Sequence, residues 1–176
     1  SEIFSPVSTP ASKRTPSPQE TLLGLSNKRG KNIMLEAIVD TNVFIRGLLK
    51  GKTSRPIIAA FIDNKFQLVI SLNLLEELVF TIRKPRLASI LPEPECASLI
   101  SLIKEVARFV DPKEEFTGCR DSKDNKFVSC ALAGNTSIIV SADSDLLDLS
   151  PLKSAMTTIE IIPPLKFLER LKSGRI

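Results

Sequence analysis

The sequence of 176 residues contains no histidine, tryptophan or tyrosine. Without histidine, the chain offers no histidine metal ligand, no Ser-His-Asp triad and no histidine general base. Catalysis would have to rest on carboxylates, lysine, cysteine, hydroxyl groups, or a metal ion held by oxygen atoms. Since tryptophan and tyrosine are missing, phenylalanine is the only aromatic side chain on which a nucleic-acid base can stack.

Long apolar runs and cysteine clusters are missing as well. No stretch approaches the roughly 18 apolar residues of a membrane span, and no hydrophobic core of a secretion signal is found near the start. The three cysteines, Cys96, Cys119 and Cys130, do not form a close metal-binding cluster. Their odd number favours a reducing compartment, so we expect a cytoplasmic protein without a membrane segment.

The net charge of +4 is unevenly distributed. Residues 1–33 hold five basic and two acidic residues, a net charge of +3, which leaves +1 for the rest. The body is therefore not a broadly basic nucleic-acid binder, and any attraction for phosphate must be local. Prolines interleaved with serine and threonine predict that residues 1–33 form a flexible basic tail. Residues 34–176 predict one domain.

Within the tail, Ser17–Glu20 has the spacing of a capping box, followed by two leucines and then Gly24. This spacing allows a single helical turn, which could dock on a partner surface. A single turn does not hold by itself in water, so an unstructured segment is the favoured interpretation.

Short apolar runs alternate with helical patterns throughout residues 34–176. Apolar runs separated by helices are typical of parallel strands that are buried on both faces. The alternation predicts an α/β fold with a central, mostly parallel sheet of about five strands between helices. Residues 46–52, basic and punctuated by glycine, are expected to form a loop. The expected strands end near residues 39, 70, 111, 141 and 162, and the expected helices cover 55–64, 72–83, 93–109, a stretch ending at 134, and 164–172.

Acidic residues follow two of the expected strands. Asp40 comes directly after the first strand, and Asp143 and Asp145 follow the strand at 137–141. The carboxyl ends of parallel strands form the ligand-binding edge of open α/β sheets, so we expect these side chains to share one cleft. Aspartate is also a common helix N-cap, and a purely structural role is the alternative.

Two further carboxylates lie on expected helices. Glu77 borders the buried stripe of its helix, and Asp124 lies one turn before Phe127 on the inward face of another. A charge at the start of a buried face is expected at the rim of a cleft. Asp121, three residues earlier, is a candidate N-cap. A solvated helix residue is the alternative for each of them.

Together, these carboxylates come from four separate elements. Several carboxylates without histidine or thiolate ligands define a site of hard oxygen donors, which suits Mg²⁺ or Mn²⁺. Such ions activate water and stabilise the oxygens of a phosphoryl displacement. The four principal residues are Asp40, Glu77, Asp124 and Asp143, with Asp121 and Asp145 beside them.

Four segments of the sequence resemble the PIN-domain family, of the kind found as the toxin in bacterial and archaeal toxin–antitoxin pairs. They occur in the same order as in the family, and the similarity extends from about Met34 to Lys172. The segments are Val39–Val43, Ser71 with Glu77-Leu78, Asp124 with its helix through Ala131, and Ser141–Leu146.

The resemblance implies a parallel sheet between helices and a metal-dependent ribonuclease that hydrolyses RNA phosphodiester bonds with Mg²⁺ or Mn²⁺. It also implies a cognate antitoxin protein and a homodimer. The residues that it assigns are Asp40, Glu77, Asp124 and Asp143 as the catalytic and metal-binding quartet, Asp145 as an auxiliary metal ligand, and Asn42 and Ser141 as polar support. Asp121, beside the quartet in the sequence, is a further supporting candidate by its position. Basic residues near the expected cleft are candidates for contacts with RNA phosphates, by location rather than by spacing: Arg46, Lys50, Lys52, Lys123 and Lys126.

Two other interpretations compete with this one. A phosphatase of the haloacid-dehalogenase type also uses an aspartate after a strand, but it needs a second aspartate two residues later. That position is Asn42 here, which disfavours the phosphatase. The stronger rival is a PIN fold retained as an RNA-binding or protein-binding module without significant turnover, because an intact acidic set is necessary for a nuclease but does not guarantee one.

Overall fold

The computed structural model describes residues 34–174. The expected tail of residues 1–33, with its candidate helical turn, lies outside the described residues. Within the described range the chain builds a six-stranded sheet with the strand order β3-β2-β1-β4-β6-β5. Neighbouring strands run parallel except β5 and β6, which are antiparallel, so the expected α/β fold with a mostly parallel sheet is confirmed. The strands are β1 (Glu36–Val39), β2 (Gln67–Ser71), β3 (Arg108–Val110), β4 (Ile138–Val140), β5 (Leu152–Lys153) and β6 (Thr158–Ile162).

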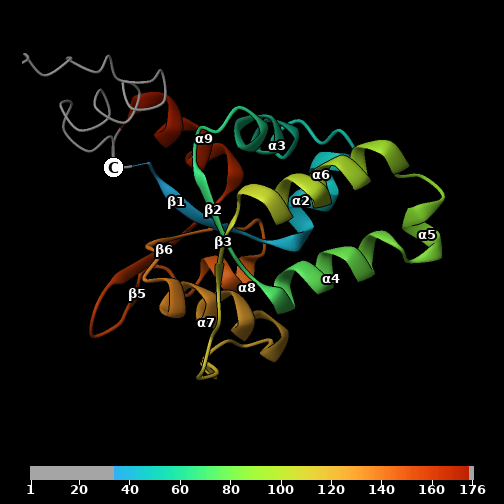
Figure 1. Ribbon diagram of the computed structural model, residues 1–176. Helices are drawn as coiled ribbons and strands as arrows, with labels where there is room; N and C mark the ends of the chain where they lie inside the picture. Colours follow the sequence, from blue (N-terminus) through green and yellow to red (C-terminus); the bar gives the residue numbers. More distant parts are fainter. Residues whose placement is uncertain (1–33, 175–176) are drawn as a thin grey trace, which may run out of the picture. The chain divides into compact units, whose positions relative to one another are not determined.

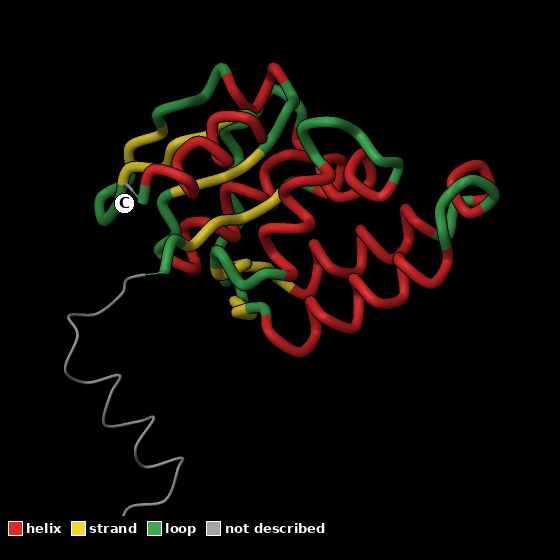
Figure 2. The backbone as a smooth tube through the Cα atoms, turned by 90° about the horizontal axis from the view of Figure 1, so that it is seen from above, coloured by secondary structure: helices red, strands yellow, loops and turns green. Residues whose placement is uncertain are grey.

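Helices cover both faces of the sheet, as Figure 1 shows. Helices α3 and α9 lie on one side of the sheet, and α7 lies on the other. Helices α4 and α6 extend side by side away from the sheet, and the short α5 joins them (Figure 2). The helices are α2 (Thr41–Leu48), α3 (Arg55–Ile62), α4 (Leu72–Ile82), α5 (Pro85–Ala88), α6 (Glu93–Val106), the 3₁₀ helix η1 (Ser122–Asp124), α7 (Asn125–Gly134), α8 (Ser144–Leu147) and α9 (Pro164–Ser173).

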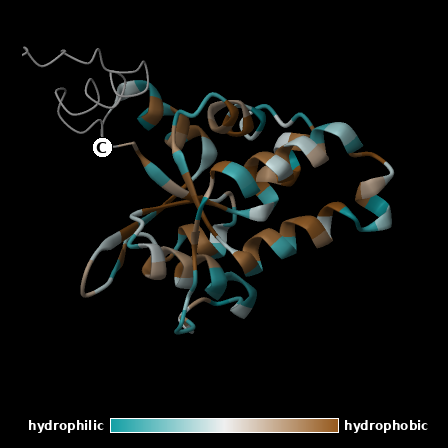
Figure 3. Cartoon of the chain, viewed as in Figure 1, coloured by the Kyte–Doolittle hydropathy of each residue, from teal (hydrophilic) through white to brown (hydrophobic). Residues whose placement is uncertain are grey.

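The central strands are apolar because side chains on both of their faces are covered. Every residue of β4 is buried, and so are the last three residues of β1. Figure 3 shows these strands as hydrophobic, whereas the outward faces of the helices are mixed. On one side of the sheet, the Phe66 ring lies 5.9 Å from that of Phe61 and 5.0 Å from that of Phe167, which ties α3 and α9 to the sheet. Polar groups of the central strands are therefore confined to the strand ends.

The pairing of β1 with β4 places the residues that follow the two strands side by side. Val39 pairs with Val140, and the backbone N–H of Asp40 donates to the carbonyl oxygen of Val140 at 2.9 Å. Asp40 and Ser141 therefore leave adjacent strands at the same level. This is the edge at which the sequence predicts an acidic cleft.

The loop expected at residues 46–52 is partly wrong. Residues 46–48 form the last turn of α2, and only the residues after them form a turn. Helix α2 starts directly after Asp40 and buries Val43, Phe44 and Leu48. Residue 47 is a glycine inside this helix because α3 packs closely against it. A Cβ atom at position 47 would lie 2.7 Å from Cδ1 of Ile58.

One further expectation changes, and two short elements were not predicted. The helix expected over 93–109 ends at Val106, because the next residues pair with β2 as strand β3. Residues 85–88 form a short helix, and β5 is a two-residue strand that is too short to produce a hydrophobic period. Among residues 34–174, no helix combines the length and the apolar character that a membrane crossing requires.

Candidate active site

Asp40 is a buried carboxylate whose two oxygens are both hydrogen-bonded. The residue is 3% exposed. As the N-cap of α2, it accepts a hydrogen bond at Oδ1 from the backbone N–H of Asn42, at 2.9 Å. Its Oδ2 accepts a hydrogen bond from the Ser141 hydroxyl at 2.7 Å. The side chain is therefore fixed in one orientation at the carboxyl end of β1.

Ser141 connects Asp40 to the second acidic segment. It is fully buried after β4, and its Oγ accepts a hydrogen bond from the backbone N–H of Asp143 at 3.0 Å while its hydroxyl donates to Asp40. Asp143 in turn caps α8, and its Oδ1 accepts from the backbone N–H of Asp145 at 2.8 Å. One hydroxyl thus sets the spacing of the two strand-end aspartates.

The pKa shifts of the aspartates indicate that four acidic segments lie close together. Burial raises the pKa of Asp40, the hydrogen bonds from Ser141 and Asn42 oppose this shift, and the charges of Asp143 and Glu77 add to it. The pKa of Asp40 is therefore raised by the carboxylate of Asp143, the N-cap of α8, and by that of Glu77 in α4. The predicted convergence of strand-end and helix carboxylates agrees with this pattern.

Asp124 shows the same effect more strongly. Burial first, and then the charges of Asp143, Asp121 and Asp40, raise the pKa of Asp124 to about 6, while Lys126 lowers it. The carboxylate lies at the junction of η1 and α7, where the chain turns into its apolar helix. The like charges that raise this pKa come from Asp121 in the same segment and from Asp143 and Asp40 in other segments, and such crowding favours the binding of a cation among them.

Glu77 faces the same cleft from α4 but is paired with a lysine. Its Oε2 atom is buried and accepts no hydrogen bond of good geometry among the described residues, although Lys126 Nζ forms an ion pair with that oxygen. Lys126 Nζ also lies 5.4 Å from the centre of the Phe127 ring. The lysine that was expected to contact RNA phosphate is therefore held by an internal carboxylate.

The other predicted residues lie around this centre. Asp121 is exposed and caps η1 through the backbone N–H of Lys123. A small cavity of about 50 Å³ between Asp40 and Asp143 is lined by Asn42 and Arg46. Exposed side chains with no contact to this cavity are Lys50, Lys52 and Lys123.

Sequence reasoning missed two residues near the acids. Arg120 pairs with Asp145, with Nη1 3.1 Å from Oδ1, so the auxiliary aspartate already has a cation beside it. Asn125 is buried, and its Oδ1 accepts a hydrogen bond from the backbone N–H of Cys119, which holds the loop before η1. The sequence offered one signal for each: Arg120 stands directly before Asp121, and Asn125 is an amide at the start of an apolar helix face.

The donor chemistry of the cleft fits a hard divalent cation, although the side chains are not arranged as a finished coordination shell. Within residues 34–174, no group of three or more His, Cys, Asp or Glu side chains is arranged to hold one metal ion. Asp40 is oriented by Ser141 and Asn42, and Glu77 by Lys126. All of the candidate donors are oxygens, and the buried Oε2 of Glu77 lacks a hydrogen bond. A cation at Glu77 would have to exchange with the Lys126 ammonium group.

The raised pKa of Asp124 predicts how stability depends on pH in EDTA. Between its ordinary value of 3.8 and about 6, the folded state binds more protons at Asp124 than the unfolded state does. The free energy of unfolding should therefore fall as pH rises through this window, by about 1–2 kcal/mol after allowance for partial exposure. Asp124→Asn should remove this part of the dependence and make the protein more stable near neutral pH.

Urea denaturation of both proteins across this pH window measures the effect. Asp63→Asn, at the exposed end of α3, is the matched control and should behave like the wild type. If the stability of Asp124→Asn had the same pH dependence as that of wild type, the inference that like charges crowd around Asp124 would be wrong.

Comparisons with known proteins identify the family of this chain. The family model for the PIN domain matches residues 36–145, a range that includes Asp40, Glu77, Asp124 and Asp143. An uncharacterized protein of Methanocaldococcus jannaschii is 27% identical over 148 residues, which cover 81% of this chain and 95% of the relative. The match to the family model begins at β1 and ends in α8, so it spans the two strands whose ends carry the central aspartates. The chain therefore belongs to the PIN-domain family, which is a family of nuclease type.

Proposed function

We propose that the protein is a metal-dependent ribonuclease that hydrolyses RNA phosphodiester bonds. The observation that carries this proposal is the buried carboxylate of Asp40, to which no cation is paired within residues 34–174 and beside which carboxylates from three other segments lie. Burying a carboxylate without a cation is costly, and crowding it with like charges adds to that cost. A bound divalent cation removes both penalties.

In this proposal Asp40, Glu77, Asp124 and Asp143 hold Mg²⁺ or Mn²⁺, with Asp145 as an auxiliary ligand. When bound, such an ion supplies an activated water and neutralises charge on the phosphate oxygens. The chain itself contributes orientation: Ser141 and Asn42 fix the Asp40 carboxylate, and Asp121 fixes the start of η1. Among the basic candidates, Arg46 lines the small cavity between Asp40 and Asp143, where it is suited to bind a phosphate oxygen.

The cellular role follows from the resemblance alone. We propose that the protein acts in the cytoplasm as the toxin of a toxin–antitoxin pair, with a cognate antitoxin protein and a homodimeric state. Membership of a nuclease-type family supports an action on nucleic acid. Co-purification of a neighbouring gene product that suppresses cleavage would test the antitoxin.

A PIN fold that binds RNA or protein without turnover is the second candidate function. The observation that favours it is the ion pair between Lys126 and Glu77, which places a protein cation where a metal ion would bind. If Lys126 stayed paired with Glu77 permanently, the fold would be kept without a metal ion bound at that carboxylate.

Incubation of the purified chain with single-stranded RNA separates the two candidates. With Mg²⁺ or Mn²⁺ we expect cleavage of the RNA, and with EDTA we expect intact RNA. Binding of RNA without cleavage in any metal would reject the ribonuclease and favour the binding module. Cleavage that continues in EDTA would contradict the metal dependence.

A further inference from the structure

Lys126 is a cation of the chain itself that contacts one of the proposed metal ligands. Its Nζ atom, on α7, forms an ion pair with the buried Oε2 atom of Glu77 on α4. The two side chains are 24% and 31% exposed, so solvent screens their attraction only in part. Among the ion pairs of residues 34–174, this is the one that joins a cation to a member of the proposed quartet. The carboxylates of the proposed metal site therefore already have a positive charge among them.

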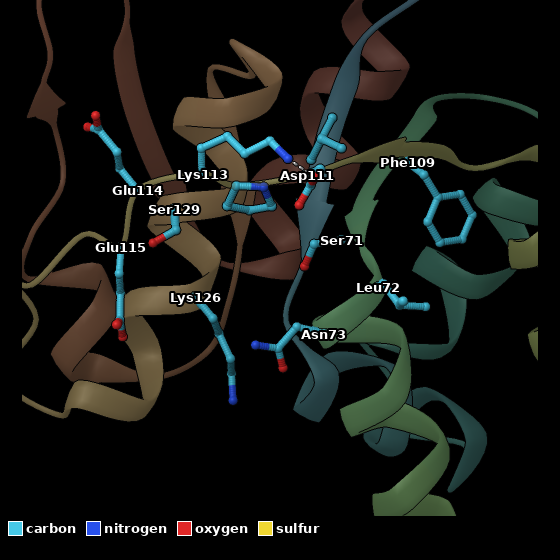
Figure 4. Close-up of a pocket in the computed structure, with 12 residues that line it drawn as sticks. Ser71, Leu72, Asn73, Phe109, Asp111, Lys113, Glu114, Glu115, Lys126 and Ser129 are labelled. Atoms are coloured by element: carbon cyan, nitrogen blue, oxygen red, sulfur yellow. Dashed lines mark hydrogen bonds and ion pairs between the residues drawn. The ribbon is translucent and has the colours of Figure 1, made fainter.

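The lysine side chain has room to move away from Glu77. It lines a pocket of about 720 Å³ at the carboxyl ends of β2 and β3. Figure 4 shows Lys126 on the α7 side of this pocket and Asn73 of α4 on the other. Asn73 lies one helical turn before Glu77, on the same face of α4. Because a lysine carries its charge on a flexible four-carbon stem, the ammonium group can leave Glu77 and enter this space while α7 stays in place.

The charge of Lys126 acts on a second carboxylate of the cleft. Burial and the charges of other carboxylates raise the pKa of Asp124 to about 6, whereas the charge of Lys126 lowers it. Since like charges at close range repel one another, the lysine relieves part of the repulsion within the cleft when no metal ion is bound. An ammonium group supplies charge alone, because it neither coordinates nor activates a water molecule.

We propose that Lys126 is an internal competitor of the metal ion, whose ammonium group takes the place of a divalent cation at Glu77 and leaves when Mg²⁺ or Mn²⁺ binds. This inference rests on the proposed function, since the quartet is the metal site that it assumes. A divalent cation that binds the quartet must break the ion pair, so it binds more weakly than it would to the same carboxylates without the lysine. The protein with Lys126 at Glu77 is folded but inactive. Lys126 thus sets the metal concentration above which the cleft is active.

Calorimetric titration of the full-length, metal-free protein with Mn²⁺ alone tests this competition. Lys126→Met keeps most of the stem and removes the charge, and it should bind Mn²⁺ about 10-fold more tightly than wild type. In EDTA the same variant should melt at a lower temperature than wild type. Lys126→Arg keeps the charge and should bind Mn²⁺ no more tightly than wild type. Lys126→Gln, which is neutral and polar, should show the same gain as Lys126→Met, so a folding defect of one variant leaves the test intact.

Lys113→Met is the matched control for the loss of charge. Lys113 lines the same pocket and forms an ion pair with Asp111, which is outside the quartet. Its variant loses the same charge and should bind Mn²⁺ as wild type does. A double-mutant cycle then locates the exchange at Glu77. In the Glu77→Gln background the lysine has lost its carboxylate, so Lys126→Met should change the affinity for Mn²⁺ by less than about 2-fold.

The outcomes separate this inference from the proposed function. Equal or weaker Mn²⁺ binding in Lys126→Met, together with metal-dependent cleavage by the wild type, would overturn the competition and leave the ribonuclease intact. A gain that persists in the Glu77→Gln background or appears equally in Lys113→Met would also overturn it, because the effect would then be one of net charge. Tighter binding in Lys126→Met, with no cleavage by the wild type in any metal, would support the competition and reject the ribonuclease. Absence of Mn²⁺ binding in every variant would reject both.

Discussion

Asp40→Asn and Asp143→Asn are each expected to abolish metal-dependent RNA cleavage, with a loss of at least about 100-fold in kcat/KM. Each change keeps the size of the side chain and removes one negative charge from the cleft. An amide oxygen is a weaker ligand for Mg²⁺ or Mn²⁺ than a carboxylate oxygen. The fold should persist, because Asn caps a helix about as well as Asp does. Initial rates on single-stranded RNA, together with circular dichroism spectra, measure both parts of the prediction.

Asp148→Asn is the matched control for this experiment. Asp148 is an exposed residue at the end of α8, five positions after Asp143, and is no part of the proposed quartet. Its variant should cleave RNA at the wild-type rate. Cleavage that persists in a carefully purified Asp40→Asn/Asp143→Asn double mutant would place the active site elsewhere or identify a contaminating nuclease.

The same Asp40→Asn change should stabilise the metal-free protein and remove most of the stabilisation by Mg²⁺. The buried carboxylate experiences desolvation and the charges of Asp143 and Glu77 in the folded state. Removing its charge relieves these penalties by about 1–2 kcal/mol, after subtraction of the hydrogen bond that Ser141 donates to it. Wild type in Mg²⁺ at about 100 times the dissociation constant should gain about 2.7 kcal/mol of stability by mass action. The variant should gain little.

Thermal melts of wild type and variant, each with EDTA and with excess Mg²⁺, measure both effects. If Asp40 served only as the cap of α2, the variant would be neutral or slightly less stable in EDTA, and Mg²⁺ would shift both proteins alike. Equal metal shifts would reject the acidic metal site, whatever the cleavage assays gave. Asp148→Asn should follow the wild type in both solutions.

The sequence predicted the elements whose side chains have one dominant environment. Strand β6 was expected at 158–162 and lies at Thr158–Ile162, and the helix expected over 72–83 corresponds to α4 with its Ser71 cap. Both combine a clear hydrophobic period with a clear boundary residue. Helix α2 was not predicted, and its last turn was expected to be a loop because it contains Arg46 and Gly47, which look like loop residues. Gly47 is explained only by Ile58 of another helix, a contact that no local pattern contains.

The candidate site was predictable in composition but not in its internal bonding. Strand-end aspartates and a polar residue at Ser141 follow from the sequence, because parallel strands deliver their ends to one edge. The ion pair between Lys126 and Glu77 does not, since these residues are 49 positions apart and meet only when α4 packs on α7. The exposure of Phe109 was missed for a similar reason. An aromatic residue in a short strand is usually part of the core, and only the edge position of β3 exposes it.

The strand order determines which insertions in the chain this site can tolerate. From β1 the chain moves outward to β2 and β3, and from β4 it moves outward to β6 in the opposite direction. The loops after β1 and β4 therefore diverge and leave a crevice between them, at the reversal point where open sheets bind ligands. The separation of Asp40 from Ser141 is set by the pairing of Val39 with Val140 and not by any loop length. Insertions in the turn after α2 or in the β5–β6 hairpin should leave the aspartates in place. A slip of one residue between β1 and β4 would turn Asp40 to the other face of the sheet.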